Sequence, residues 1–345
     1  MKRVLVNIVS EQTVPNYLFV KEFENEADLF LFISSRAMET REKTKIIFKT
    51  AGISKNRVRK ILVQEDEWYL AKAKLDKLGW TIGEYQFLVN ISGGTKLMSN
   101  AVYEYFKQYN SRFFYLPIAK NEIRELFKDK PAQSRPVKYS ISVKEYLCLH
   151  DIAYSEEEML LDEKKTMMLY DIFAKNNFHH FPITLITGLN INGQQKEALW
   201  FEHYLFYKIK ALLALGDLQI KTGIKLYKKG KEKNFSDNLT DNEIDIVFIK
   251  NNNCYIVEAK VSVGKKKINT GAITSYLYKL AAINKRFGIN AKAVLMLFAE
   301  LNTLSPISLR NMKRRCEVLN LPVPFDRHDL IDGAVFKNKM LTFVN

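Results

Sequence analysis

Residues 243–261 read EIDIVFIKNNNCYIVEAKV, and this stretch decides the fold of the C-terminal half of the chain. Apolar residues alternate with Glu243 and Asp245, so a strand here places both carboxylates on one face. Three asparagines follow and favour a turn, and the apolar run behind them is typical of a returning strand. Glu258 and Lys260 are two residues apart and share a face of that second strand. The stretch therefore predicts a hairpin that brings Asp245, Glu258 and Lys260 together.

These three residue types are the ones that phosphodiester hydrolysis requires. Two carboxylates can hold a hard divalent ion such as Mg2+ or Mn2+, which polarises the phosphate and acidifies water. A neighbouring lysine can orient that water or stabilise the developing charge. We therefore take Asp245, Glu258 and Lys260 as candidate catalytic residues. The alternative is an exposed hairpin with alternating charges, but the apolar run before Glu258 makes a solvated strand less expected.

A third carboxylate lies upstream, in a helix predicted over residues 196–215. Trp200-Phe201-Glu202 places an acid within an apolar segment of that helix. Glu202 is therefore a candidate metal ligand beside Asp245 and Glu258, and the alternative is a glutamate on the helix surface. Further along, a predicted helix near 270–287 and a strand at 293–298 complete an α/β unit.

The N-terminal half alternates strands with helices. Its apolar runs and periodicities predict strands at 4–9, 45–48, 85–89 and 112–116, and helices at 25–39, 65–78 and 95–109. Alternation of this kind predicts a parallel sheet with helices on both faces. The fold class expected for the whole chain is α/β, with a doubly wound Rossmann-like domain first and a second α/β domain after it.

A glycine-rich loop stands between a strand and a helix of this half, and it reads Asn90-Ile91-Ser92-Gly93-Gly94-Thr95-Lys96. Its two glycines allow close approach of the backbone to a ligand, and the amides at a helix start favour an anion. The spacing matches neither the Walker A motif nor the dinucleotide fingerprint. The alternative is a simple turn in which Thr95 caps the helix.

Charge is distributed unevenly along the chain. Its 53 Lys and Arg exceed its 38 Asp and Glu, for a net charge of +15. The predicted domains at 1–135 and 191–345 hold 23 basic against 16 acidic and 25 against 14, whereas the predicted helical connector at 136–190 holds 5 against 8. Basic surfaces attract polyanions, so nucleic acids or nucleotides are the favoured partners. The connector's Glu156-Glu157-Glu158 is expected to be a solvated helix surface.

The three cysteines, Cys148, Cys254 and Cys316, are isolated from one another and from matching histidines. This spacing argues against a zinc site and a disulfide framework and fits a cytoplasmic setting. No stretch approaches the ~20 apolar residues of a membrane helix, so no membrane partner is expected.

The motifs of the C-terminal half resemble a known nuclease family. Trp200-Phe201-Glu202, Glu243-Ile244-Asp245, Val257-Glu258-Ala259-Lys260 and Tyr278-Lys279-Leu280 are similar, in type and order, to the PD-(D/E)xK restriction-endonuclease-like domain of CRISPR-associated nucleases activated by cyclic oligoadenylate. The resemblance implies that Glu202, Asp245 and Glu258 bind Mg2+ or Mn2+ and that Lys260 is catalytic. It gives Glu243 and Lys279 auxiliary roles.

The glycine-rich loop and its flanking elements resemble the CRISPR-associated Rossmann-fold (CARF) sensor. That resemblance implies binding of cyclic tetra-adenylate across a homodimer, through the loop after the first strand and the glycine-rich loop. The implied ligand residues are Ser10, Gln12, Asn16, Ser92, Gly93, Gly94, Thr95 and Lys96. The combined resemblance implies an allosterically activated ancillary nuclease of type III CRISPR antiviral defence. The substrate that the resemblance implies is DNA, which is nicked or cleaved as single strands, with RNA as a further substrate.

Two other functions are compatible with the same residues. A ligand-responsive nucleic-acid-binding regulator would have a C-terminal fold that is basic but catalytically silent. A restriction or repair nuclease would keep the catalytic hairpin without control by a cyclic nucleotide. Cleavage assays on Glu258→Ala or Lys260→Ala variants separate the first from a nuclease, and calorimetry with cyclic oligoadenylate separates the second from a sensor.

Overall fold

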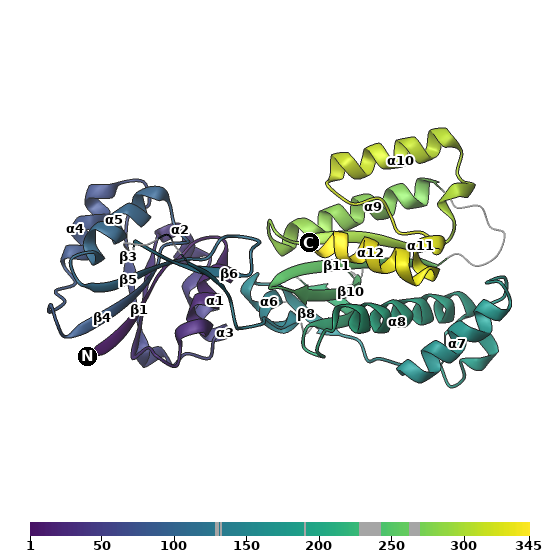
Figure 1. Ribbon diagram of the computed structural model, residues 1–345, viewed down its shortest axis with the longest axis horizontal. Coiled ribbons are helices and arrows are strands. Elements are labelled where there is room, and N and C mark those ends of the chain that lie inside the picture. The colour runs from purple at the N-terminus through teal and green to yellow at the C-terminus, as the bar shows by residue number, and fades with distance from the viewer. Residues whose placement is uncertain (128–130, 132, 190, 228–242, 262–269) are drawn as a thin grey trace. The chain divides into compact units, whose positions relative to one another are not determined.

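The structure is a computed structural model that describes residues 1–345 except 128–130, 132, 190, 228–242 and 262–269 (Figure 1). It divides into two units. The first contains Met1–Ile141 and Cys148–Asp151, and the second contains Ser142–Leu147 and Ile152–Asn345. Each unit has its own sheet.

The first unit is a seven-stranded sheet in the order β3-β2-β1-β4-β5-β6-β7. Its strands are β1 (Lys2–Ile8), β2 (Leu29–Ser34), β3 (Val58–Leu62), β4 (Tyr85–Asn90), β5 (Asn110–Tyr115), β6 (Glu122–Leu126) and β7 (Ser134–Pro136). Its helices are α1 (Thr13–Phe23), α2 (Arg36–Thr40), α3 (Lys43–Thr50), η1 (Lys55–Arg57), α4 (Trp68–Asp76) and α5 (Lys96–Phe106). The first five strands in this order run parallel to one another. Strand β6 pairs antiparallel with β5, and β7 pairs antiparallel with β6.

The strand order confirms the doubly wound prediction and defines a switch point. After β1 the chain builds outward through β2 and β3, and it then returns to add β4 on the other side of β1. The loops after β1 and β4 therefore leave the sheet side by side, at the edge where open α/β sheets bind ligands. The register pairs Asn7 with Asn90, the last paired residues before these loops.

Two elements predicted for this unit are wrong. Residues 25–39 form β2 and the short α2 instead of one helix, and residues 45–48 lie in α3 instead of a strand. Strand β2 pairs with β1 on one side and β3 on the other. Its successive residues Phe30 to Ser34 are all buried, so both faces of the strand are covered and polar residues do not alternate with apolar ones. Short apolar runs such as Ile46-Ile47-Phe48 do not separate helix from strand by periodicity. Helix α1 was not expected at all.

The second unit is a five-stranded sheet in the order β12-β11-β10-β9-β8. Its strands are β8 (Ala153–Glu156), β9 (Ile220–Tyr227), β10 (Glu243–Lys250), β11 (Asn253–Val261) and β12 (Lys292–Phe298). Its helices are α6 (Val143–Leu149), α7 (Glu163–Lys175), η2 (Ile183–Leu185), α8 (Gly193–Leu213), α9 (Thr270–Asn284), η4 (Lys285–Phe287), η5 (Leu301–Thr303), α10 (Pro306–Leu319), α11 (Arg327–Ile331) and α12 (Gly333–Val344). The last residues of α6 are assigned to the first unit.

Helices cover both faces of this second sheet. The core that includes Trp200 of α8, Phe173 of α7 and Met340 of α12 packs on side chains of β10, β11 and β12. Figure 1 shows α8 on one side of the strands and α9 and α10 on the other. Helix α8 starts at a capping box in which the side chains of Asn192 and Gln195 each accept the other's backbone N–H. Such a box fixes the start of a helix.

The predicted separate connector at 136–190 is not a separate element in the described structure. Strand β8 pairs with β9 as an edge strand of the second sheet. Helix α7 packs on α8, where the indole Nε1 of Trp200 donates to the backbone O of Thr166 at 3.1 Å. The acidic segment was expected to be helical, but Ala153–Glu156 forms a strand because it pairs with β9, about 70 residues later in the sequence.

Candidate active site

Strands β10 and β11 form the predicted hairpin. Their register runs from Lys250 opposite Asn253 to Ile246 opposite Val257. Asn251 and Asn252 connect them with φ of 51° and 60°, the left-handed conformation that tight hairpin turns require. The same register, continued by one residue, places Asp245 opposite Glu258.

The two strands separate where the carboxylates begin. The backbone N–H of Ala259 donates to Oδ2 of Asp245 at 2.6 Å, so a side chain takes the place of a backbone partner. On the other side of β10, the hydroxyl of Thr222 in β9 donates to the backbone O of Asp245 at 2.7 Å. Next to Thr222, Gly223 has a φ of 61°. Asp245 is therefore fixed through both its carboxylate and its carbonyl.

Lys260 joins the two hairpin carboxylates. Its Nζ lies 3.0 Å from Oδ2 of Asp245 and 2.9 Å from Oε1 of Glu258. Both acids are buried, with 6% of Asp245 and 1% of Glu258 exposed. Lys279 of α9 approaches Oε1 of Glu258 to 3.5 Å. The structure thus brings together the three predicted catalytic residues and adds Lys279 at their edge.

The pKa values of the cluster indicate that its buried carboxylates are not fully balanced by positive charge. Burial, followed by repulsion from Glu258, raises the pKa of Asp245 to about 6. Burial, followed by repulsion from Asp245, raises the pKa of Glu202 to about 9. Burial disfavours the ammonium of Lys260, but Asp245 and Glu258 outweigh it and raise the lysine's pKa above its usual value. Glu202 of α8 thus lies close enough to the hairpin for its ionisation to depend on it.

Glu243 stands at the start of β10, opposite Lys225 of β9. Burial and repulsion from Glu157 raise its pKa, and Lys225 opposes this shift. Glu157 forms an ion pair with Lys225, and its backbone N–H donates to the O of Gly223 at 3.0 Å. The expectation that Glu156-Glu157-Glu158 is a helix surface is therefore wrong, because Glu156 ends β8 and Glu157 reaches the edge of the site.

The donor set fits a hard divalent cation. Carboxylate oxygens are the ligands that such ions prefer. A bound cation would offset both the burial and the repulsion that raise the pKa of Asp245 and Glu202. Among the described residues, the hydrogen bonds to the carboxylate of Asp245 all end on Oδ2, which leaves its Oδ1 for a ligand. Glu202, Asp245 and Glu258 could together hold such an ion.

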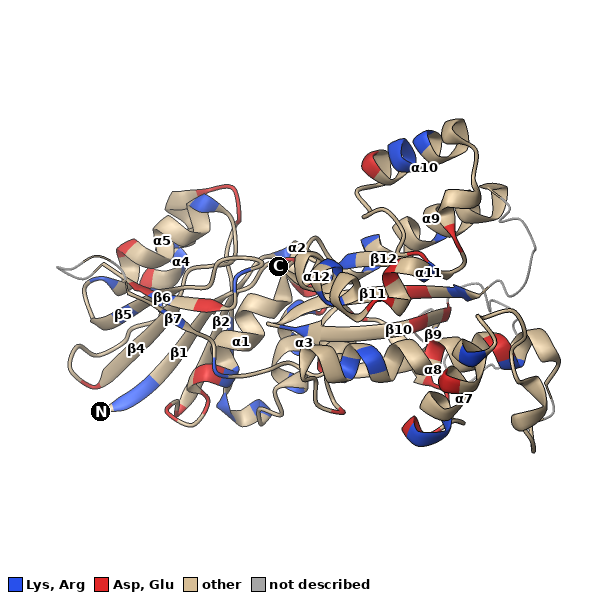
Figure 2. Cartoon of the chain, turned by 45° about the vertical axis from the view of Figure 1, so that its right-hand side comes forward, with Lys and Arg blue, Asp and Glu red and all other residues tan. Residues whose placement is uncertain are grey.

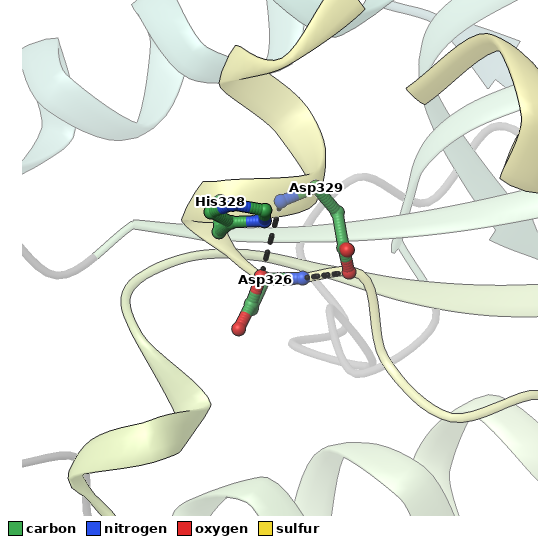
Figure 3. Close-up of side chains that lie close together, drawn as sticks. All are labelled: Asp326, His328 and Asp329. Atoms are coloured by element: carbon green, nitrogen blue, oxygen red, sulfur yellow. Dashed lines mark hydrogen bonds between the residues drawn. The ribbon is translucent and has the colours of Figure 1, made fainter. Parts of the chain in front are cut away.

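Another group of possible ligand atoms lies around α11 and has a different explanation. Asp326, His328 and Asp329 each offer a ligand atom within 4.8 Å of the others. The close-up shows both aspartates bonding to each other's backbone (Figure 3). The N–H of Asp329 donates to Asp326 at 3.1 Å and the N–H of Asp326 donates to Asp329 at 3.1 Å, while Lys339 neutralises Asp329 at 2.5 Å. This capping box starts α11, and together with the ion pair to Lys339 it explains why these side chains lie close together.

The glycine-rich loop of the first unit lies at the switch point after β4. A Cβ on Gly93 would be 2.2 Å from the backbone O of Ile8, and Gly94 has a φ of 75°. Only glycine fits at Gly93 without moving the end of β1, and Gly94 has the left-handed conformation that favours glycine. Lys96 is the first residue of α5 and is exposed.

Ser92 and Thr95 hold the shape of this loop. The hydroxyl of Ser92 donates to Oδ1 of Asn90 at 2.6 Å and accepts from the N–H of Leu116 at 2.7 Å. Thr95 caps α5, because its Oγ1 accepts from the N–H of Met98 at 3.2 Å. Both predicted ligand residues thus have a structural role, whereas Gly94 and Lys96 present their surface to solvent.

The predicted ligand residues after β1 fall into two kinds. Ser10 and Gln12 are half-buried in the loop, and the hydroxyl of Ser10 donates to the O of Gln12 at 3.1 Å. Asn16 lies within α1 and is 1% exposed, with its Nδ2 donating to the O of Ile8 at 2.9 Å. The expectation that Asn16 reads adenine or ribose conflicts with this burial. Its amide instead fastens α1 to the end of β1.

Sequence reasoning missed residues that reach the site from a distance. Thr222, Glu157 and Tyr276 belong to this group, and the ring of Tyr276 lies 5.6 Å from Nζ of Lys260. A cavity of about 610 Å³ at the ends of β2 and β3 was also missed. Its lining includes Ser35, Gln64 and Lys74. No local pattern marks these residues, because pairing between distant segments brings them together.

A buried pair of carboxylates and a lysine on a diverging hairpin, in an α/β unit, is the arrangement expected of a nuclease site of the PD-(D/E)xK class. Family comparisons agree with this class. Residues 4–146 match the Card1 CARF domain, and residues 194–315 match the Card1-like endonuclease domain. The chain therefore combines, in this order, a domain that matches the Card1 CARF model and a domain that matches the Card1-like endonuclease model.

Solved structures share this fold at low sequence identity. Can2 from Sulfobacillus thermosulfidooxidans, in complex with cyclic tetra-adenylate, has a TM-score of 0.65 and 15% identity, with 99% of each chain covered. Protein VC1899 from Vibrio cholerae has a TM-score of 0.73 and 15% identity over 99% of each chain. A type III CRISPR defence DNA nuclease activated by cyclic oligoadenylate has a TM-score of 0.59 and 16% identity, covering 86% of this chain and 45% of that one.

Curated protein sequences give no match to this chain. In the part of the chain that the structure describes, no helix combines the length and apolar character needed to cross a bilayer.

Proposed function

We propose that this protein is a metal-dependent endonuclease of type III CRISPR antiviral defence. A cyclic oligoadenylate, in this proposal cyclic tetra-adenylate, activates it. The observation that carries the nuclease half is the contact of Lys260 with both Asp245 and Glu258, at 3.0 Å and 2.9 Å, where β10 and β11 separate. Buried charges are costly, so a cluster of this kind is more consistent with chemistry than with stability.

The residues have distinct tasks in phosphodiester hydrolysis. Glu202, Asp245 and Glu258 would hold Mg2+ or Mn2+, which when bound polarises the phosphate and lowers the pKa of a coordinated water. Lys260 remains protonated, because its neighbours raise its pKa, and its ammonium stabilises charge on the phosphate. Lys279 adds a second positive charge beside Glu258, and Glu243 is an auxiliary acid at the edge.

The sensor half rests on the switch point of the first unit. Gly93 and Gly94 bring a backbone close to the end of β1, and Lys96 offers a charge at the start of α5. Amides and a cation at a helix start suit the phosphates of a cyclic oligoadenylate. Ser10 and Gln12 lie on the adjacent loop. In this proposal the ligand binds a homodimer. The solved complex of Can2 with cyclic tetra-adenylate supports the choice of ligand.

The substrate in this proposal is DNA, which the enzyme nicks or cleaves as single strands, with RNA as a second substrate. The test measures cleavage of supercoiled plasmid, single-stranded DNA and RNA with Mn2+ or Mg2+, with and without cyclic tetra-adenylate. We expect cleavage that needs both metal and ligand. Full-rate cleavage without the ligand would overturn the sensor half. Absence of cleavage in every combination would favour a binding regulator.

Binding measurements separate the two halves of the proposal. Titration calorimetry with cyclic tetra-adenylate on the wild type and on Lys260→Ala should give equal affinities, because Lys260 belongs to the nuclease unit. A Lys260→Ala variant that binds the ligand but cleaves nothing supports both halves. Wild-type protein that cleaves DNA but binds no ligand supports a nuclease under a different control.

A further inference from the structure

Helix α9 lies between the active site and α10. Its Lys279 approaches Glu258 to 3.5 Å on one side. On another side, Nη1 of Arg315 in α10 donates to Oγ1 of Thr274 at 2.8 Å. These two contacts identify which sides of α9 face the catalytic hairpin and α10.

The exposed face of α9 occupies the arc between these two contacts. At 3.6 residues per turn, Lys279 lies about 140° around the helix from Thr274. Tyr278 lies between them, about 40° from Thr274 and about 100° from Lys279. Tyr278 is 55% exposed, whereas Leu277 and Leu280 on the opposite arc are buried. The ring of Tyr278 therefore stands in solvent between the active site and α10. An arc of 100° on a helix about 11 Å across corresponds to about 10 Å of surface.

The surface around Tyr278 is positively charged. Helix α9 contains no Asp or Glu, and α10 contains one, Glu317. Arg314, Lys285 and Arg286 are exposed, and none of them forms an ion pair with a residue that the structure describes. Figure 2 shows Lys and Arg along α10. This contrasts with Lys339 in α12, which is paired with Asp329.

Helix α10 presents its cations on two different flanks. Arg314 follows Arg315 around the exposed side, about 100° away. Lys313 lies on the other flank, because the buried residues Met312 and Cys316 separate it from Arg315. Arg314 is thus a solvent-facing cation about 100° around α10 from the residue that contacts α9, whereas Lys313 lies about 160° from it.

An exposed aromatic ring among cations that have no ion-pair partner in the described part of the chain fits one class of ligand. Unpaired bases stack on aromatic side chains, and cations follow the phosphates of the same strand. Bases of a duplex are already stacked on each other and offer no free face. We propose that Tyr278 and Arg314 form a binding surface for single-stranded DNA, on which Tyr278 stacks an unpaired base about 10 Å from the catalytic cluster. This inference rests on the proposed nuclease function.

The experiment measures binding of a fluorescein-labelled single-stranded DNA 20-mer by anisotropy, with full-length protein, cyclic tetra-adenylate and Ca2+. Tyr278→Ala should weaken binding roughly tenfold, and Tyr278→Phe should stay within about twofold because it keeps the ring. The Tyr278→Ala effect should disappear on an abasic oligonucleotide and on a duplex of the same length. Thermal melting of each variant checks that the fold is intact.

The charge half has a matched pair of variants. Arg314→Gln should lower the slope of log affinity against log salt by about 0.7, the value for one phosphate contact on a single strand. Lys313→Gln, on the other flank, should leave the slope unchanged. Equal effects of the two substitutions would overturn the assignment of Arg314.

The inference and the proposed function can fail separately. Wild-type protein that cleaves the 20-mer in Mn2+, together with Tyr278→Ala that binds it as tightly as the wild type, overturns the inference alone. A loss on the duplex as large as on the single strand also overturns it. Wild-type protein that cleaves no nucleic acid overturns the nuclease proposal on which the inference rests.

Discussion

Asp245 accepts a hydrogen bond from the backbone N–H of Ala259, at 2.6 Å, where β10 and β11 stop pairing. A side chain proposed to bind metal therefore also satisfies a buried backbone donor. An unsatisfied buried donor costs about 1–3 kcal/mol. The same contact links the shape of the hairpin to the position of the carboxylate, and it determines how substitutions at Asp245 should behave.

Two substitutions of Asp245 separate its structural and chemical roles. Asp245→Asn keeps an acceptor for Ala259 and removes the charge, so we expect a stable fold without metal-dependent cleavage. Asp245→Ala removes both and should lower the free energy of unfolding by about 1–3 kcal/mol more than Asp245→Asn does. Urea unfolding and plasmid cleavage measure the two roles. Equal stability of the two variants would show that Ala259 does not depend on the carboxylate.

A bound metal ion should compensate for the loss of the Lys260 charge in the stability of the fold, but it should not restore cleavage. Lys260→Met leaves Asp245 and Glu258 without their shared ammonium, which should destabilise the metal-free protein by about 3 kcal/mol. A bound cation would again neutralise Asp245 and Glu258, so Mn2+ should raise the melting temperature of Lys260→Met more than that of the wild type. Cleavage should fall by about 10²–10⁴-fold.

The matched control is Lys339→Met, which removes the lysine paired with Asp329 at 2.5 Å in α11. It should lower the melting temperature without changing the shift caused by Mn2+. An equal Mn2+ shift in Lys260→Met and in the wild type would argue against a metal site between the hairpin carboxylates.

Metal binding should expel a proton. Burial and repulsion from Asp245 raise the pKa of Glu202 to about 9, so at pH 7.5 its carboxyl is protonated in the metal-free protein. A ligand must be deprotonated, so Mn2+ binding should release about one proton and become tighter as pH rises toward 9. Calorimetry in buffers of different ionisation enthalpy measures this release. Release that persists in Glu202→Gln would assign the proton to another group.

The sequence predicted the local part of the site and missed the distant part. Glu258, Lys260 and Asp245 share one hairpin, so alternation alone places them on a common face. Glu157 and Thr222 arrive through β8 and β9, whose pairing no local pattern records. Tyr276 belongs to a helix whose face was not predicted.

The same reasoning explains the outcome for the first unit. The run at 4–9 and the loop at 90–96 are recognisable from neighbouring residues, and both lie where a doubly wound sheet requires them. Strand β2 was read as a helix because its central position buries both faces. Asn16 was read as a loop residue because α1 was not expected, and the structure places it in the interior.

Gly93 should tolerate no side chain. A Cβ at this position would be 2.2 Å from the backbone O of Ile8, so Gly93→Ala must displace the loop or the end of β1. We expect a loss of about 2–3 kcal/mol in the free energy of unfolding, and loss of cyclic tetra-adenylate binding. Gly333→Ala is the control, because no atom lies within 4 Å of its Cβ position. It should change stability by no more than about 0.5 kcal/mol.

Asn16 and Lys96 should give opposite results when each is replaced by alanine. Asn16 donates to the O of Ile8 at 2.9 Å from a buried position, so Asn16→Ala should lower the free energy of unfolding by about 1–3 kcal/mol. Lys96 is exposed at the start of α5, so Lys96→Ala should leave stability unchanged and weaken cyclic tetra-adenylate binding roughly tenfold. Urea unfolding and calorimetry on both variants provide the comparison. Because burial withdraws Asn16 from the ligand surface, its variant should bind the ligand normally at temperatures where it remains folded. Weakened binding by folded Asn16→Ala would return this residue to the ligand site, and unchanged binding by Lys96→Ala would remove the cation from it.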